Sequence, residues 1–219
     1  MTSQVLERQL QAADKRWLTR FLHGPSRLRW EMLPPQVGDS APDVVLPDSE
    51  GRQVRLSEEW VQAPLHLIFL RHYGCSCGKE RAAQLNEEYA RLTDSGARVV
   101  AIGQGEPERT VEYIRVRQMP CPVLCDTDYR AYDAYGVLEG TPATIFHDEE
   151  WKPNDERAGR KLMKSRRDTD MRVVDNPWLL PAEFVIDRQG IIRHAHRYQY
   201  CEDYPLTAVL VGAIRAAAG

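Results

Sequence analysis

The sequence has no long apolar run and no marked excess of either charge. No stretch reaches the roughly 18 consecutive apolar residues that a membrane-spanning helix needs. The first residues also lack the apolar core and the small-residue cleavage site of a signal peptide. The net charge is only −3, and nucleic acids and anionic membranes are bound mainly by basic surfaces. We therefore expect a cytoplasmic protein with neither nucleic acid nor membrane as its main partner.

Cysteine is also scarce, with five in 219 residues. Small secreted domains held together by disulfides carry denser and usually even sets of cysteines, so this odd number argues against a disulfide framework. In a reducing compartment, cysteines are instead buried, bound to metal or catalytic. Cys75 and Cys77 are separated by a single residue, and that pair is the feature to explain.

The residues on either side of the pair predict a strand, a loop and a helix. Residues 65–70 are short and nearly all apolar, which is typical of a buried central strand in a parallel sheet. After the cysteines, apolar residues recur at helical spacing, namely Ala82, Ala83, Leu85, Tyr89 and Leu92. The N-terminus of a helix carries about half a positive charge and unpaired N–H groups, which favour thiolate over thiol. The pattern therefore predicts a reactive Cys75.

The rest of the chain predicts one α/β domain, residues 37–219, preceded by a helical extension, residues 1–36. Pro34 and Pro35 mark the boundary. The domain is expected to begin with a hairpin and to continue with alternating strands and helices. A strand, a helix and a second strand imply a right-handed parallel crossover, which places the cysteine loop at the carboxyl edge of the sheet. The expected elements after the extension are a hairpin over 43–56, strands at 98–102 and 122–125, helices at 108–117 and from 126, a hairpin over 183–196, and a last helix at 205–218.

Residues 139–176 are mostly polar and too long for a plain turn. We interpret them as a solvated excursion, with a lid or a dimer contact over the thiols as the alternative. The stretch includes a basic cluster made of Arg157, Arg160, Lys161, Lys164, Arg166 and Arg167.

Four motifs in order carry a resemblance to a known family. They are Val37-Gly38-Asp39-Ser40-Ala41-Pro42-Asp43, Arg71-His72-Tyr73-Gly74-Cys75, Pro122-Val123-Leu124-Cys125-Asp126 and Leu180-Pro181-Ala182-Glu183-Phe184. With them the chain resembles the thioredoxin-fold superfamily, in its peroxiredoxin-like branch related to alkyl hydroperoxide reductase and thiol-specific antioxidant proteins. The resemblance implies a three-layer α/β/α sandwich with a central mixed sheet. It also implies that Cys75 is the redox-active cysteine and that Pro181 is a cis-proline facing it.

The sequence departs from this family at two places. Typical peroxiredoxins carry threonine or serine three residues before the reactive cysteine and proline four residues earlier still, whereas this chain has His72 and Ile68. Relatives often have Cys-x-x-Cys, whereas Gly78 stands here where the second cysteine would be. Neither standard active site is intact, so reduction of peroxides and reduction of disulfides are both open.

Several side chains are candidates to assist Cys75. Arg71 lies close enough in sequence to stabilise a thiolate, and His72 acts either as a local base or as a packed neighbour. Cys77 is the nearest resolving thiol, but side chains two apart on a helix do not face one another. A disulfide between Cys75 and Cys77 would therefore need the first turn to open, or would be strained.

Three other cysteines compete for the resolving role. Cys125 ends a strand expected two strand spacings from Cys75, or about 10 Å, which exceeds the reach of a disulfide. Cys121 is similarly placed, and the position of Cys201 is not constrained by this argument.

These features lead to the hypothesis of a thiol-dependent redox enzyme that needs no cofactor. Cys75 would attack a peroxide or a substrate disulfide, a second thiol would resolve the product, and a dithiol protein or a low-molecular-weight thiol would supply electrons. The alternatives are a redox-silent interaction module and a copper(I) site built from Cys75, Cys77 and His72. The first helix is expected to pack on the domain or on a second copy, which would make a homodimer.

Overall fold

The computed structural model describes residues 3–146, 152–165 and 175–219, without the side chains of 3 and 162–165. Its centre is a five-stranded sheet. In spatial order the strands are β5 (Val123–Cys125), β4 (Arg98–Gly103), β3 (Leu65–Phe69), β6 (Ala182–Ile186) and β7 (Ile192–Arg197).

The sheet is mixed, as predicted. β3 runs parallel to β4, with Leu65 opposite Arg98, and β4 runs parallel to β5. β6 is antiparallel to both of its neighbours. The predicted N-terminal hairpin is a separate pair, β1 (Val45–Pro47) and β2 (Gln53–Arg55). β3 and β6 are buried at every position, which explains why the sequence of each is almost continuously apolar.

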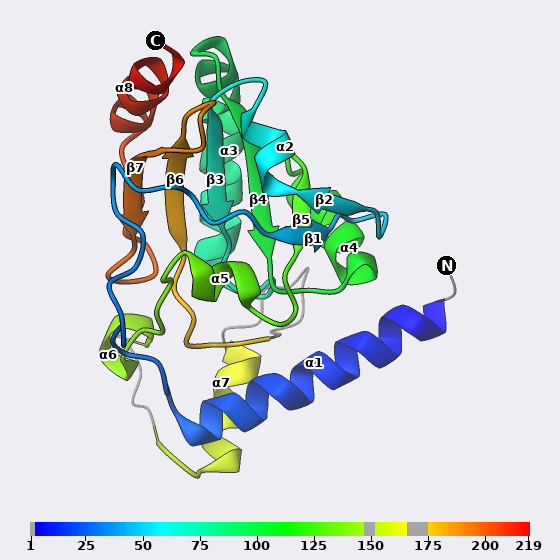
Figure 1. The fold of residues 1–219 in the computed structure, drawn as a ribbon. Coiled ribbons are helices and arrows are strands. Elements are labelled where there is room, and N and C mark those ends of the chain that lie inside the picture. The colour runs from blue at the N-terminus through cyan, green and yellow to red at the C-terminus, as the bar shows by residue number, and fades with distance from the viewer. Residues whose placement is uncertain (1–2, 147–151, 166–174) are drawn as a thin grey trace.

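Helices cover both faces of the sheet and complete the predicted three-layer sandwich (Figure 1). The layer on one face comprises α3 (Ser76–Asp94), α4 (Pro107–Arg117) and α8 (Thr207–Ala218). The other face is covered by α2 (Leu56–Trp60), α5 (Arg130–Ala134) and the β1–β2 hairpin. In α3, Ala82, Leu85 and Leu92 are buried at helical spacing and form one side of the core.

α1 (Ser3–His23) crosses below the edge of the sheet at which β3 ends (Figure 1). Ala13, Trp17 and Phe21 recur every four residues and are each at most 1% exposed, so the apolar face of the helix is buried within its own chain. The rings of Phe21 and Trp178 stack at 6.1 Å. The expectation that the helix packs on the domain is therefore met in the single chain, while the division at residue 36 stays a prediction.

The polar excursion contains α6 (Pro142–Ile145) and α7 (Glu156–Ser165), and α7 contacts α1. Gly159 permits this approach, because a Cβ there would lie 2.7 Å from the Phe21 ring. Arg157, Arg160 and Lys161 are exposed on α7, as a solvated surface requires. The side chain of Lys164 and residues Arg166 and Arg167 lie outside the described part.

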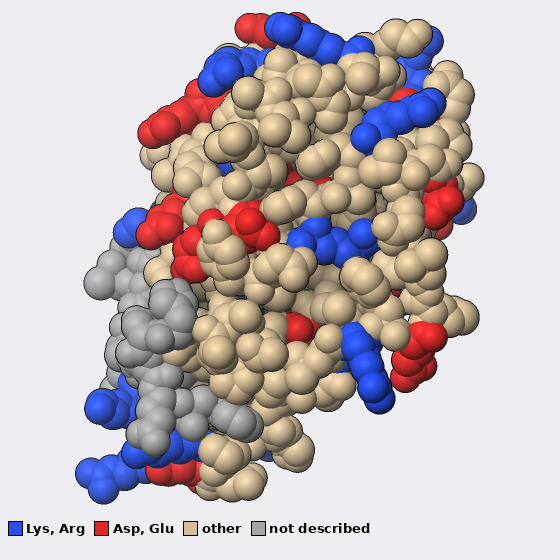
Figure 2. All heavy atoms as spheres, turned by 90° about the vertical axis from the view of Figure 1, so that its left-hand side faces the viewer, with Lys and Arg blue, Asp and Glu red and all other residues tan. Residues whose placement is uncertain are grey.

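The surface seen from the β7 side carries charges of both signs among a larger number of uncharged side chains (Figure 2). No continuous basic surface covers the described atoms of that face, in line with the net charge of −3. In the described ranges, every helix is too short or too polar to span a bilayer.

Candidate active site

The two cysteines of the loop between β3 and α3 are joined in a disulfide. Cys75 is the N-cap of α3, with φ −76° and ψ 134°, and the helix begins only at Ser76. The N–H of Cys75 donates to the carbonyl of His72 at 3.1 Å. Because Cys75 precedes the helix, the disulfide closes with the first turn intact, and the opening of that turn, one of the two expected alternatives, is not needed. The extended N-cap directs its side chain across the first turn, and the two Cα atoms are 5.4 Å apart, within the usual range for a disulfide.

The two cysteine residues differ in their exposure to solvent. Cys77 lies in the first turn of α3 and is only 3% exposed, whereas Cys75 is partly exposed. A reagent from outside therefore reaches Cys75 more readily. Cys75 also stands at the helix N-terminus, where partial positive charge stabilises a thiolate released from the disulfide.

Arg71 is buried beside the loop and pairs with backbone oxygen atoms. Its guanidinium donates to the carbonyls of Pro177, at 2.9 Å, and Leu179. Its Nε–H has no partner among the described residues. Arg71 thus holds the segment before β6 against the cysteine loop. Its predicted contact with the Cys75 thiolate stays a prediction.

Pro181 precedes β6 as predicted, but its peptide bond is trans, as is every peptide bond in the described ranges. The prediction of a cis-proline was wrong. The backbone on both sides is already paired: the N–H of Leu180 donates to Leu138 at 3.0 Å, and the carbonyl of Pro181 accepts from Tyr198 at 3.2 Å. A cis X-Pro bond is a minority state that packing must select, and these contacts are made with the trans isomer.

His72 is buried, and burial together with the Arg71 cation holds its pKa well below the usual value. The imidazole is therefore neutral near pH 7. Its Nδ1 has no partner within the described part of the chain. Its backbone carbonyl receives the Cys75 N–H, so the main-chain oxygen of this residue has a defined role in the loop.

Cys121 and Cys125 lie toward the β5 edge, with β4 between that strand and β3. This is the separation that the sequence predicted for Cys125. Burial raises the pKa of Cys121 to about 12 and that of Cys125 to about 11. The Cys125 thiol donates to Thr110 at 3.2 Å. Both groups are thus protonated near pH 7 and poorly suited to nucleophilic attack.

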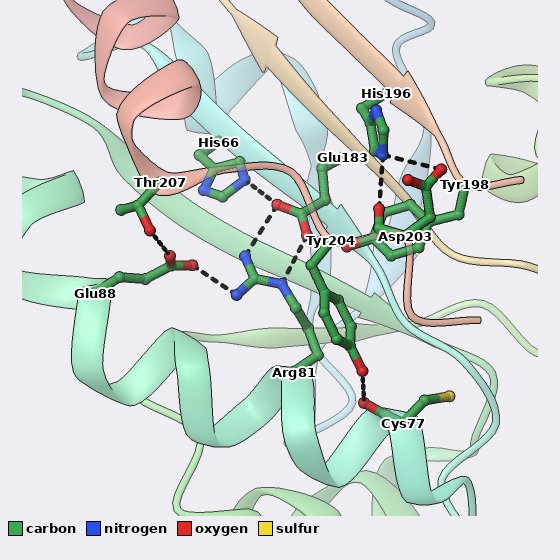
Figure 3. A network of polar contacts seen from close by, with 10 residues as sticks. All are labelled: His66, Cys77, Arg81, Glu88, Glu183, His196, Tyr198, Asp203, Tyr204 and Thr207. Atoms are coloured by element: carbon green, nitrogen blue, oxygen red, sulfur yellow. Dashed lines mark hydrogen bonds and ion pairs between the residues drawn. The ribbon is translucent and has the colours of Figure 1, made fainter. Parts of the chain in front are cut away.

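A buried ionic network adjoins the first turns of α3 (Figure 3). Glu183 of β6 is fully buried and accepts from Arg81 at 2.7 and 3.0 Å. It also accepts from Tyr198 at 2.6 Å and contacts His66 at 2.8 Å. Burial raises the pKa of Glu183, but Arg81 and His66 outweigh it and hold that pKa far below the usual value. The ionised carboxylate is therefore the centre of the network.

The network extends along α3 in both directions. Arg81 also pairs with Glu88 at 2.6 Å, and Glu88 accepts from Thr207 at the start of α8. Toward the disulfide, the hydroxyl of Tyr204 donates to the carbonyl of Cys77 at 2.9 Å (Figure 3). Polar contacts thus fix α3 to β6 and to the start of α8, and the Tyr204 contact fixes the turn that carries Cys77 to the chain segment after β7.

The sequence reasoning missed this network, although two residues indicated it. A charged residue stands in the otherwise apolar strand 182–186, and His66 stands in strand 65–69. Buried charges are nearly always paired. In the antiparallel register Glu183 lies opposite Ile68, so His66 is its diagonal neighbour.

A small cavity lies between α3, the end of β3 and the segment after β7. It brings together three of the predicted site residues, Arg71, Cys77 and Pro181. Cys75 and His72 are not among the residues that line it. The remaining lining residues are Ile68, Phe69, Leu70, Gly78, Arg81, Tyr198, Cys201 and Tyr204.

The copper(I) hypothesis gains no ligand set from the structure. Across the described ranges, no group of three or more histidine, cysteine or acidic side chains is arranged to hold a metal ion.

Comparisons with known proteins agree with this fold. The chain is 32% identical over 119 residues to the thiol-disulfide oxidoreductase ResA of Geobacillus thermodenitrificans, which covers 53% of this chain and 66% of that protein. It is 27% identical over 107 residues to the chloroplastic thioredoxin-like protein AAED1 of Arabidopsis thaliana, which covers 49% of this chain and 43% of that protein. The chain thus spans between about two fifths and two thirds of the length of these relatives.

A solved structure extends the likeness over most of the fold. The peroxidoxin BcpB of Mycobacterium tuberculosis superposes with a TM-score of 0.60 at 18% identity, over 84% of this chain and 99% of that one. The family model described as the AhpC/TSA family matches residues 37–195. Because that match takes in the hairpin, the cysteine loop, four strands of the central sheet and most of β7, the chain belongs to the AhpC/TSA family.

Proposed function

We propose that the chain is a thiol-dependent redox enzyme in which Cys75 is the nucleophile and Cys77 the resolving thiol. The observation that carries this proposal is the disulfide between them at the start of α3. A cysteine pair that can form a disulfide across a helix N-terminus accepts two electrons when the disulfide is reduced and releases them when it forms again. Membership of the AhpC/TSA family supports thiol chemistry at this loop.

The substrate we propose first is a disulfide. The Cys75 thiolate attacks one sulfur of the substrate, and the first substrate thiolate leaves as a mixed disulfide forms. Cys77 then attacks Cys75, which releases the second substrate thiol and closes the Cys75–Cys77 disulfide. The substrate is reduced by two electrons and the enzyme is oxidised by two. A dithiol protein or a low-molecular-weight thiol returns the pair to the reduced state.

Two observations favour a disulfide over a peroxide. His72 replaces the hydroxyl residue that typical peroxiredoxins carry three residues before the cysteine, and its buried imidazole is neutral. The relative ResA is named a thiol-disulfide oxidoreductase. The second candidate, a peroxide, is favoured by the family itself. There, Cys75 would be oxidised to sulfenic acid as the peroxide is reduced to an alcohol or water, and Cys77 would expel water to form the same disulfide.

Single-turnover reactions with the reduced protein distinguish these substrates. The protein is mixed with glutathione disulfide, hydrogen peroxide or cumene hydroperoxide, and intact mass is followed in the wild type and in Cys75→Ser and Cys77→Ser. For a disulfide substrate, Cys77→Ser should accumulate a glutathione adduct on Cys75. For a peroxide it should accumulate a sulfenic acid. Full turnover by Cys75→Ser with every oxidant contradicts the proposal in both forms.

We place the protein in the cytoplasm. The support is that Cys121, Cys125 and Cys201 are buried thiols outside the disulfide, a pattern typical of a reducing compartment. Fractionation of cells that express the tagged chain tests this location. A homodimer is the remaining proposal on partners, and sedimentation of the purified protein tests it.

A further inference from the structure

Cys201 is a third thiol at the same site. It lies in the segment between β7 and α8 and is only 3% exposed, although its neighbour Tyr200 is 48% exposed. It lines the small cavity together with Cys77, Gly78 and Arg71. It also belongs to the apolar cluster that contains Cys77 and against which Cys75 packs. The fold thus gathers three of the five cysteines in one place.

The segment that carries Cys201 is fixed at both ends to the wall of this cavity. Three residues before it, the hydroxyl of Tyr198 donates to Glu183 at 2.6 Å. Three residues after it, the hydroxyl of Tyr204 donates to the carbonyl of Cys77 at 2.9 Å. Burial raises the pKa of Tyr204, so this hydroxyl stays protonated and remains a donor. The rings of the two tyrosines meet edge to face at 6.1 Å. Cys201 is held beside the helix turn that carries Cys77.

Cys121 and Cys125 have no such placement. They lie toward the far edge of the sheet, beyond β4, and neither lines this cavity. Of the three thiols outside the disulfide, only Cys201 shares both the cavity and the apolar cluster with Cys77.

We propose that Cys201 accepts the disulfide from Cys77 and so frees Cys75 for a further reaction; this relay rests on the function proposed above. Cys201, as its thiolate, attacks the sulfur of Cys77. The Cys75–Cys77 bond breaks as the Cys77–Cys201 bond forms, and Cys75 leaves as a thiolate. The proton lost by Cys201 balances the one that Cys75 can take up, and no electron enters or leaves the chain.

Attack at Cys77 is the direction that the structure supports. Cys77 lines the cavity that holds Cys201, whereas Cys75 does not. Cys75 is also a good leaving group, because the partial positive charge at the N-terminus of α3 stabilises its thiolate.

The test uses Cys75→Ser, in which Cys77 can pair only with another thiol. The reduced variant is oxidised with diamide, alkylated in acid and mapped by peptide mass spectrometry. We expect a loss of two hydrogens and a Cys77–Cys201 peptide as the main product. Cys75→Ser/Cys201→Ser should lose this product, while the matched control Cys75→Ser/Cys125→Ser should retain it. A main product that joins Cys77 to Cys121 or Cys125, or no intramolecular disulfide, overturns the relay.

A second measurement does not use the Cys75→Ser variants. Wild-type protein in the oxidised state is treated with iodoacetamide, and the share of molecules alkylated at Cys75 is compared with that in Cys201→Ser. The relay predicts alkylation of Cys75 in the wild type and its loss in Cys201→Ser; equal alkylation contradicts it. If the wild type reduces disulfides but no Cys77–Cys201 link forms, only the relay fails. If the link forms but the wild type turns over no oxidant, only the proposed function fails.

Discussion

Replacing Glu183 with glutamine tests whether the buried network holds α3 against β6. The substitution preserves the shape of the side chain but removes the charge that faces Arg81 at 2.7 and 3.0 Å. Breaking a buried ion pair on one side costs about 3–5 kcal/mol. Because Arg81 keeps its pairing with Glu88, we expect the lower end, about 3 kcal/mol. For a chain of this size, that corresponds to a fall in Tm of about 6–12 °C.

The difference in stability between the wild type and this variant should depend on pH. The pKa of Glu183 in the fold lies far below its ordinary value of 4.5, so its contribution to stability is fully present above pH 4.5. It is lost as the pH falls from there toward the folded-state pKa, at about 1.4 kcal/mol per pH unit. Glu183→Gln cannot show this loss. The gap in unfolding free energy between wild type and variant should therefore be constant near neutral pH and shrink below pH 4.5.

Urea unfolding followed by circular dichroism, in buffers from neutral to acidic, measures this gap. Glu87→Gln is the matched control, since Glu87 is exposed on α3, the helix that carries Arg81, and surface substitutions change stability by only about 0.5 kcal/mol. If Glu183→Gln is as stable as the control, or if the gap stays constant down to acidic pH, the network does not stabilise α3 as described.

Three further predictions concern the surroundings of the disulfide. Trp17→Ala removes a ring that is 1% exposed from the apolar cluster that contains Cys77. We expect the free energy of unfolding to fall by about 3–5 kcal/mol and a soluble phosphine to reduce the disulfide faster. Unchanged reduction kinetics would contradict the idea that Trp17 of α1 shields the disulfide. In Gly103→Ala the new Cβ would meet the hydroxyl of Tyr73, and the overpacking should cost about 1–3 kcal/mol in a denaturant titration, whereas a neutral substitution would refute that contact. The depressed pKa of His72 predicts that its imidazole proton signals stay constant in NMR spectra as the pH falls from 8 to about 6. Because the unfolded state takes up this proton more readily, the protein should also lose stability below pH 6.5. An NMR titration midpoint between pH 8 and about 6 would show that the ring is not buried as described.

The layers of the fold could be predicted, because they follow from sequence patterns within single segments. The hairpin of β6 and β7 was predictable because Asp187 and Gly190 form the turn: Asp187 accepts from the N–H groups of Gln189 and Ile191, and Gly190 has φ +78°. The order of strand, helix and strand likewise sufficed to place the cysteine loop at the carboxyl edge.

The details of the site depend on the exact start of a helix and on contacts between segments that are distant in the sequence. The disulfide exists because Cys75 has an extended backbone immediately before the helix, a difference of one residue in the helix boundary. Sequence patterns place such boundaries least well. The isomer of the Pro181 bond likewise depends on contacts made by Leu138 and Tyr198, which are distant in the sequence.

The pairing of Arg81 with Glu183 joins residues 102 positions apart, and no local pattern specifies it. The isolated charge in strand β6 indicated only that a partner exists. Cys201 is a similar case, because its position beside Cys77 depends on how the segment after β7 turns back onto α3.

Turnover by Cys75→Ser shows whether Cys75 is the nucleophile. Reduced wild type and variant are each given glutathione disulfide and hydrogen peroxide with a regenerating dithiol, and consumption of each oxidant is followed beside the intact mass. We expect the wild type to consume at least one oxidant and to form the Cys75–Cys77 disulfide, while Cys75→Ser consumes neither. Consumption at the wild-type rate by Cys75→Ser would contradict this expectation.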